Sequence, residues 1–124
     1  MTDFAAIFQA LKTIPGEHAD RLIVKANTPV SYILVTKAAS PFPQHKGHSM
    51  YFAEVRLGKA YVSYHLMPLY MSPELAPEIT PGLKKRMQGK TCFNFKTIPD
   101  PVLLEDLKNL TAACIRFWDG KHWL

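Results

Sequence analysis

The sequence contains no apolar run close to the roughly 20 residues that a membrane-spanning helix requires. Its N-terminus lacks the basic segment and apolar stretch of a secretion signal. Only two cysteines are present, Cys92 and Cys114, too few for the disulfide framework of a small secreted domain. We therefore expect a cytoplasmic protein with reduced thiols and no membrane partner.

The common signatures of catalysis and metal binding are also missing. No nucleophile–base pair at a diagnostic spacing and no phosphate-binding loop occurs in the sequence. His65 has no ligand three or four residues away, and His45, His48 and His122 fall in a loop or the tail without companion ligands. We expect no transition-metal site, no cofactor and a noncatalytic protein.

What is present is the composition of an ordinary folded domain. The 124 residues are 48% hydrophobic and 20% charged, which places the chain far from the disordered class. A chain of this length can bury about two thirds of its surface. Residues 1–124 should form a single domain, and its net charge of +5 favours acidic over basic partners.

Two amphipathic segments predict the terminal helices. The first should be capped by Thr2 and end at Pro15-Gly16. Its apolar stripe consists of Phe4, Ile7, Phe8 and Leu11. The last should begin at Asp100-Pro101, with a stripe formed by Leu103, Leu107, Leu110, Cys114 and Phe117.

Two more cap–proline pairs, Ser72-Pro73 and Thr80-Pro81, predict short helices, the second reaching about Gln88 with Gly89 as its stop. Strands are expected at residues 22–25, 31–36, 50–57, 60–66 and 91–96. Gly58-Lys59 predicts a two-residue hairpin between the third and fourth strands.

These elements predict an α+β fold. We expect one mostly antiparallel sheet of about five strands, with the N- and C-terminal helices packed on one face. In the strand at 91–96, Phe93 and Phe95 alternate with polar residues and should point into the core. The other face of the sheet is then the candidate site.

Polar side chains on two strands should gather on that face. The predicted ligand-binding residues are Tyr61, Ser63, His65, Cys92, Asn94 and Lys96. Lys96 would supply positive charge, and Asn94 and His65 would supply both donors and acceptors. We expect them to recognise a small anionic or polar molecule that carries an acidic or carbonyl oxygen.

Two alternative functions use the same region. Lys90 and Lys96 flank Cys92 and would favour its thiolate, so a thiol-dependent enzyme with His65 as base is one alternative. A second is a protein-interaction module using the basic segment of Lys84, Lys85, Arg86, Lys90 and Lys96. Nucleic-acid binding is disfavoured because the nearby aromatics, Phe93 and Phe95, are assigned to the core.

Two stretches carry a resemblance to a known family. Tyr61-Val62-Ser63-Tyr64-His65-Leu66-Met67-Pro68-Leu69-Tyr70-Met71, and Leu83-Lys84-Lys85-Arg86-Met87-Gln88-Gly89-Lys90-Thr91-Cys92-Phe93-Asn94-Phe95, resemble the YdhG-like family of small bacterial α+β domains of unknown function. Weaker similarity runs through residues 24–29 and the terminal helix. Some members of the wider superfamily are described as frataxin-like iron chaperones, so the resemblance implies that function as the third alternative.

The residues depart from a frataxin-type pattern. Frataxin-like iron binding relies on an acidic ridge along the first helix, because clustered carboxylates attract a hard cation. Asp3 is the only acid before Glu17 in this chain. An iron site would need the fold to bring together Glu54, Glu74 and Glu78, and we expect no tight iron binding.

Overall fold

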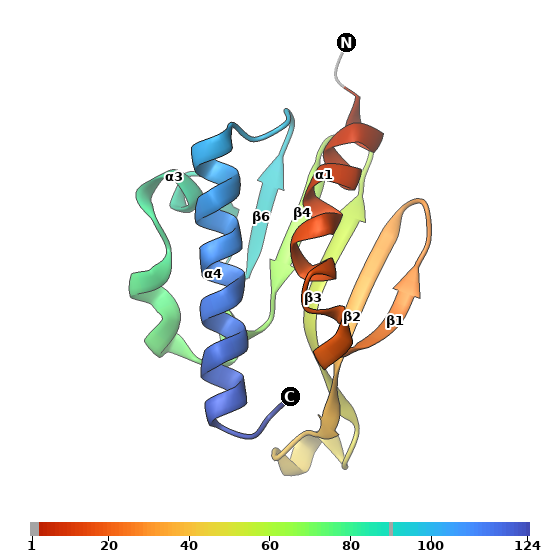
Figure 1. The fold of residues 1–124 in the computed structure, drawn as a ribbon, viewed down its shortest axis with the longest axis vertical. Coiled ribbons are helices and arrows are strands. Elements are labelled where there is room, and N and C mark those ends of the chain that lie inside the picture. Colours follow the sequence, from red (N-terminus) through yellow and green to blue (C-terminus); the bar gives the residue numbers. More distant parts are fainter. Residues whose placement is uncertain (1–2, 90) are drawn as a thin grey trace.

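The computed structural model describes residues 3–89 and 91–124, which form one sheet and its covering helices (Figure 1). The helices and strands are α1 (Phe4–Gly16), β1 (Ile23–Asn27), β2 (Ser31–Ala39), β3 (Ser49–Leu57), β4 (Val62–Leu66), α2 (Pro68–Met71), α3 (Pro81–Lys84), β5 (Met87–Gln88), β6 (Cys92–Phe95) and α4 (Pro101–Gly120). Short 3-10 turns are η1 (Ala19–Arg21), η2 (Pro43–His45) and η3 (Pro73–Glu78).

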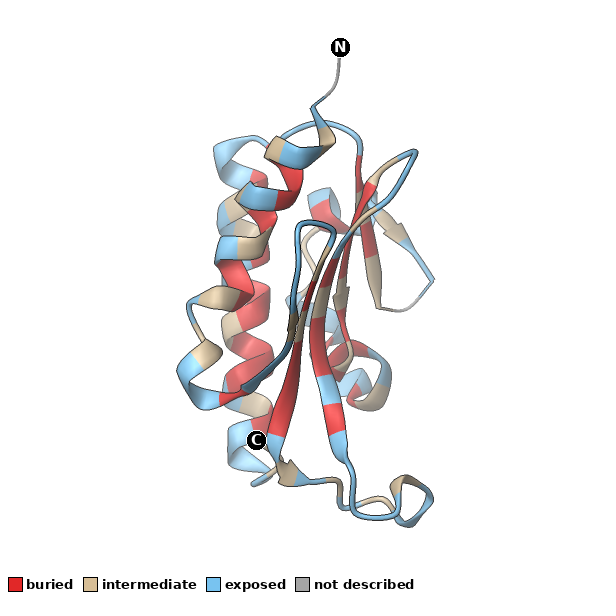
Figure 2. Cartoon of the chain, turned by 90° about the vertical axis from the view of Figure 1, so that its right-hand side faces the viewer, coloured by how far each residue is buried: buried red, intermediate tan, exposed pale blue. Residues whose placement is uncertain are grey.

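The sheet has six strands in the order β1-β2-β3-β4-β6-β5, and every neighbouring pair is antiparallel. The long helices α1 and α4 both lie on one face of it (Figure 1). Seen from the side, the buried residues lie where the helices meet the sheet (Figure 2). This arrangement confirms the predicted α+β fold, and we call the face opposite the helices the open face.

The additional strand, β5, lies where the sequence predicted the end of a helix. Helix α3 ends at Lys84 instead of reaching Gln88, and Met87 and Gln88 pair with Phe93 and Cys92. The chain reverses at Gly89, whose φ of 81° suits glycine. Pairing gives the edge of β6 backbone partners across a tight turn, and a helix signal read from the residues of α3 alone does not include this gain.

The β3–β4 hairpin also differs from its prediction. Leu57 pairs with Val62, which leaves a four-residue connection rather than the expected two-residue turn at Gly58-Lys59. The Gly58 backbone N–H donates to the Tyr61 carbonyl at 3.0 Å. A Cβ atom at Gly58 would lie 2.8 Å from that carbonyl oxygen, so the turn requires glycine for close approach.

The helix caps agree with the sequence in part. Asp100 caps α4 by accepting from the Leu103 N–H at 2.8 Å. Asp3 caps α1 through the Ala6 N–H at 3.1 Å, whereas Thr2, the predicted cap, lies outside the described residues. Ser72 does not cap η3 through its side chain, because its hydroxyl instead accepts from the Trp118 indole N–H at 3.2 Å.

The core fills the space between the sheet and helices α1 and α4. Phe93 is 0% exposed and Phe95 is 1% exposed, which confirms their predicted placement. Tyr64 is also fully buried, and its hydroxyl shares a hydrogen bond of 2.7 Å with Thr111 on α4. Among the described residues, no helix is both long and apolar enough to cross a membrane.

Candidate functional site

The strand order brings the predicted site residues of β4 and β6 side by side. Ser63 pairs with Asn94, and His65 pairs with Cys92. On the other side of β4, Ser63 pairs with Arg56 and His65 with Glu54. Because directly opposed residues share one face of a sheet, these pairs form two polar rows across the open face.

A hollow of about 560 Å³ lies over these rows, and we call it the open-face hollow. Its walls are formed by Arg56, Gly58, Lys59, Ala60, Tyr61, Ser63, His65, Gln88, Cys92 and Asn94. Five of the six predicted site residues are among them. Lys96 is not: it follows the last residue of β6 and is exposed, so it does not supply positive charge to this hollow as predicted.

Asn94 organises the hydrogen bonds of the open-face hollow. Its Oδ1 atom accepts from the Ser63 hydroxyl at 3.2 Å and from the Cys92 thiol at 3.1 Å. Its Nδ2 group donates to Gln88 Oε1 at 2.6 Å. A side chain held by three partners presents fixed dipoles, so the floor of the hollow is preorganised.

The environment of Cys92 opposes thiolate formation. Burial raises the pKa of the Cys92 thiol, the Ser63 hydroxyl partly offsets this rise, and the Glu54 carboxylate adds to it. The sequence predicted the opposite direction from Lys90 and Lys96. Lys90 lies outside the described residues, and among the described groups burial has the largest effect on the pKa of Cys92.

His65 is half-buried beside Glu54 and Arg56. Burial lowers the pKa of its imidazole, the Glu54 carboxylate raises it, and the Arg56 guanidinium lowers it again. The net direction is downward, so His65 is mainly neutral at pH 7. A neutral imidazole supplies one hydrogen-bond donor and one acceptor.

Sequence reasoning missed the basic groups of the hollow. Arg56 and Lys59 both line it, in place of Lys96. Arg56 Nη2 lies 3.2 Å from Glu54 Oε2, but its side chain remains 65% exposed, so this ion pair is weak and leaves the guanidinium accessible. Glu54 and Arg56 are two residues apart on a predicted strand, and this spacing indicates that their side chains share one face of the sheet.

The basic segment does not form a uniformly positive surface. Lys85 and Arg86 line a separate hollow of about 320 Å³ together with Asp100 and Asp106. Two cations of the basic segment, Lys85 and Arg86, therefore share a hollow with acidic side chains. Lys84 is exposed and does not line that hollow.

The carboxylates required for an iron site lie apart. Glu54 is on β3, whereas Glu74 and Glu78 are on η3 and line a hollow beside α4. Across residues 3–89 and 91–124, no three His, Cys, Asp or Glu side chains group to hold a metal ion. The described residues thus offer no carboxylate cluster for hard-cation binding.

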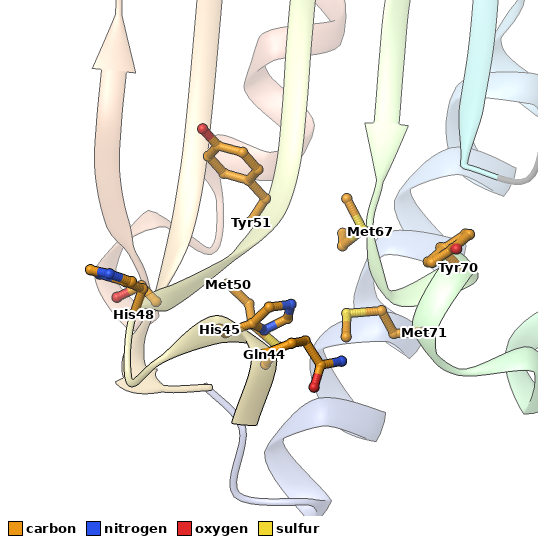
Figure 3. Close-up of a pocket in the computed structure, with 9 residues that line it drawn as sticks. Gln44, His45, His48, Met50, Tyr51, Met67, Tyr70 and Met71 are labelled. Atoms are coloured by element: carbon orange, nitrogen blue, oxygen red, sulfur yellow. The ribbon is translucent and has the colours of Figure 1, made fainter. Parts of the chain in front are cut away.

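A second hollow, of about 460 Å³, lies at the end of the sheet where β3 begins and β4 ends (Figure 3). We call it the methionine pocket. It is lined by Gln44, His45, His48, Ser49, Met50, Tyr51, Met67, Tyr70 and Met71. Its two walls, residues 44–51 and 67–71, are distant in the chain, so their contact follows from the fold and not from sequence order.

The comparisons with known proteins give no family for this chain. No protein-family model, curated protein or solved structure matches the sequence or the fold. The YdhG-like resemblance stays a prediction from the residues quoted for it.

Proposed function

We propose that this protein is a binding domain whose open-face hollow holds a small molecule through an acidic or carbonyl oxygen. The observation that carries the proposal is the convergence of polar groups from four strands, β3, β4, β5 and β6, over one hollow of about 560 Å³. That volume is within the usual range for small-molecule sites. Arg56 and Lys59 supply positive charge at its rim, and Asn94 anchors its floor.

The protonation states support binding over catalysis. A thiol enzyme needs a thiolate or a base poised to generate one. Here burial raises the pKa of Cys92, and its thiol donates to Asn94 Oδ1 rather than to an imidazole. The neighbouring His65 and Cys92 then act as neutral hydrogen-bonding groups that orient a ligand.

Thermal unfolding in the presence of small carboxylates tests the proposal. Acetate, succinate and citrate, each compared with chloride at equal ionic strength, should raise the melting temperature of the wild type, because a ligand that binds only the folded state stabilises it. Arg56→Ala should abolish most of the carboxylate-specific rise. Lys96→Ala removes the same charge outside the hollow and should preserve it. The proposal would be contradicted if both variants lost the carboxylate-specific rise in melting temperature equally, or if no carboxylate raised the melting temperature of the wild type more than chloride does.

A further inference from the structure

Two methionines of the methionine pocket are held on one helical turn. Met67 and Met71 are four residues apart, and the Met71 N–H donates to the Met67 carbonyl at 3.3 Å. This spacing places both side chains on the same side of the turn. The Met67 N–H also donates to the Phe52 carbonyl on β3 at 3.0 Å, which fixes the turn against the sheet.

His45 approaches these methionines from the opposite wall. Figure 3 shows its ring on the side of the pocket that faces Met71, and Met67 lines the same pocket. Its Nδ1 atom lies 2.5 Å from the Ser40 hydroxyl, and its ring makes an edge contact with Phe42 at 5.7 Å. Phe42 is in turn packed against Trp123 at 5.4 Å.

These contacts resemble the support that protein metal sites give to a histidine ligand. A ligating imidazole commonly donates its second ring N–H to a neighbouring polar group, which fixes its tautomer and orientation. The Ser40 hydroxyl can take this role for His45, because it lies within hydrogen-bond distance of Nδ1. In the tautomer whose Nδ1–H donates to Ser40, Nε2 is the nitrogen that can bind a metal.

We propose that His45, Met67 and Met71 form a binding site for monovalent copper. Thioether sulfur is a soft ligand that selects Cu(I), and imidazole binds copper as well. None of the side chains lining the pocket is acidic, so its ligand set is neutral. A monovalent ion leaves one charge to be stabilised there, whereas Fe²⁺ or Zn²⁺ would leave two in a largely apolar hollow.

This proposal departs from the sequence prediction of no transition-metal site, which considered no methionine as a ligand. The partners of His45 are thioethers from a segment more than twenty positions later. The proposal is independent of carboxylate binding in the open-face hollow, which has a different set of polar walls.

Methyl NMR of protein labelled at the methionine methyl groups tests the site with Ag(I) as a redox-inert substitute for Cu(I). The titration uses silver nitrate in chloride-free buffer, on wild type and on Cys92→Ser, which removes the more accessible thiol as a competing soft ligand. One equivalent should shift the Met67 and Met71 methyl signals in both proteins. Met87, on β5 and outside the pocket, is the internal control and should not shift.

Variants then assign the ligands. Met67→Leu with Met71→Leu should weaken Cu(I) binding at least about tenfold in competition with bicinchoninate under anaerobic conditions. Met87→Leu should leave it unchanged. The proposal is wrong if the Met67 and Met71 signals do not move with Ag(I), or if they move only while Cys92 is present. Should the double variant fold poorly, the wild-type methyl titration decides by itself.

Discussion

Cys92 and His65 are neighbours across two strands, yet burial pushes both toward their uncharged forms. It raises the pKa of the thiol and lowers the pKa of the imidazole. The pair therefore lacks the thiolate–imidazolium character that activates a nucleophilic cysteine. At the residue scale, the open-face hollow is a set of neutral donors and acceptors with Arg56 and Lys59 at its rim.

The first prediction concerns the reactivity of Cys92. Because its pKa is raised, iodoacetamide should alkylate Cys92 more slowly than glutathione at neutral pH. Cys114 is an internal control: burial raises its pKa to about 12, and the folded protein should not label there. Labelling of Cys92 faster than glutathione, slowed by His65→Gln, would favour the thiol-enzyme alternative.

The second prediction concerns pH and His65. Its pKa in the folded protein lies below the value of about 6.5 expected in the unfolded chain. As the pH falls below 6.5, the unfolded chain takes up the proton first, so the contribution of His65 to stability is complete above that pH and is lost as the pH falls through the folded-state pKa.

The free energy of unfolding is measured by urea denaturation between pH 5 and 7.5. It should decrease as the pH falls in the wild type and should depend less on pH in His65→Gln. His122→Gln, which removes an exposed imidazole, is the control. A ring-proton NMR titration that gives His65 a pKa above 6.5 would contradict the prediction.

At the element scale, β6 separates the core from the site by strand alternation. Phe93 and Phe95 are buried against the helices, and Cys92 and Asn94 line the open-face hollow. Because neighbouring side chains of a strand point to opposite faces, this one short strand contributes apolar side chains to the core and polar side chains to the open-face hollow.

The third prediction tests this alternation. Phe95→Ala should lower the free energy of unfolding by about 3–5 kcal/mol, because it leaves a cavity in the core. The matched control is Ile98→Ala, which truncates a side chain that is 55% exposed nearby and should change it by about 0.5 kcal/mol or less. Similar midpoints of chemical denaturation for both variants would show that β6 faces the other way.

Local sequence signals predicted the elements that local forces determine. The stripe of α4, its Asp100 cap and the alternation around Phe93 gave a correct fold class. These local signals failed at residues 87–88, which pair with β6 as a strand instead of extending helix α3. They also gave no account of Arg56 and Lys59, which strand pairing and hairpin geometry bring over β4.

At the scale of the whole molecule, the charge distribution bears on the iron-chaperone alternative. The net charge is +5, and the described residues hold no carboxylate cluster suited to a hard cation. The fourth prediction is that anaerobic calorimetric titration with ferrous iron shows no micromolar or tighter binding. Stoichiometric binding at that affinity would contradict it, and loss of that binding in Glu54→Gln would assign the iron site to Glu54.

We propose that the open face of the sheet is where a small oxygen-bearing ligand binds. Two-dimensional amide NMR with added succinate, compared with chloride at equal ionic strength, is the decisive test of this proposal. We expect saturable shifts at residues 56–65, 88–89 and 91–94, around Arg56 and Asn94, with residues 44–49 and α4 unmoved. Shifts confined to the methionine pocket or to the helices, or the same shifts in Arg56→Ala, would contradict it.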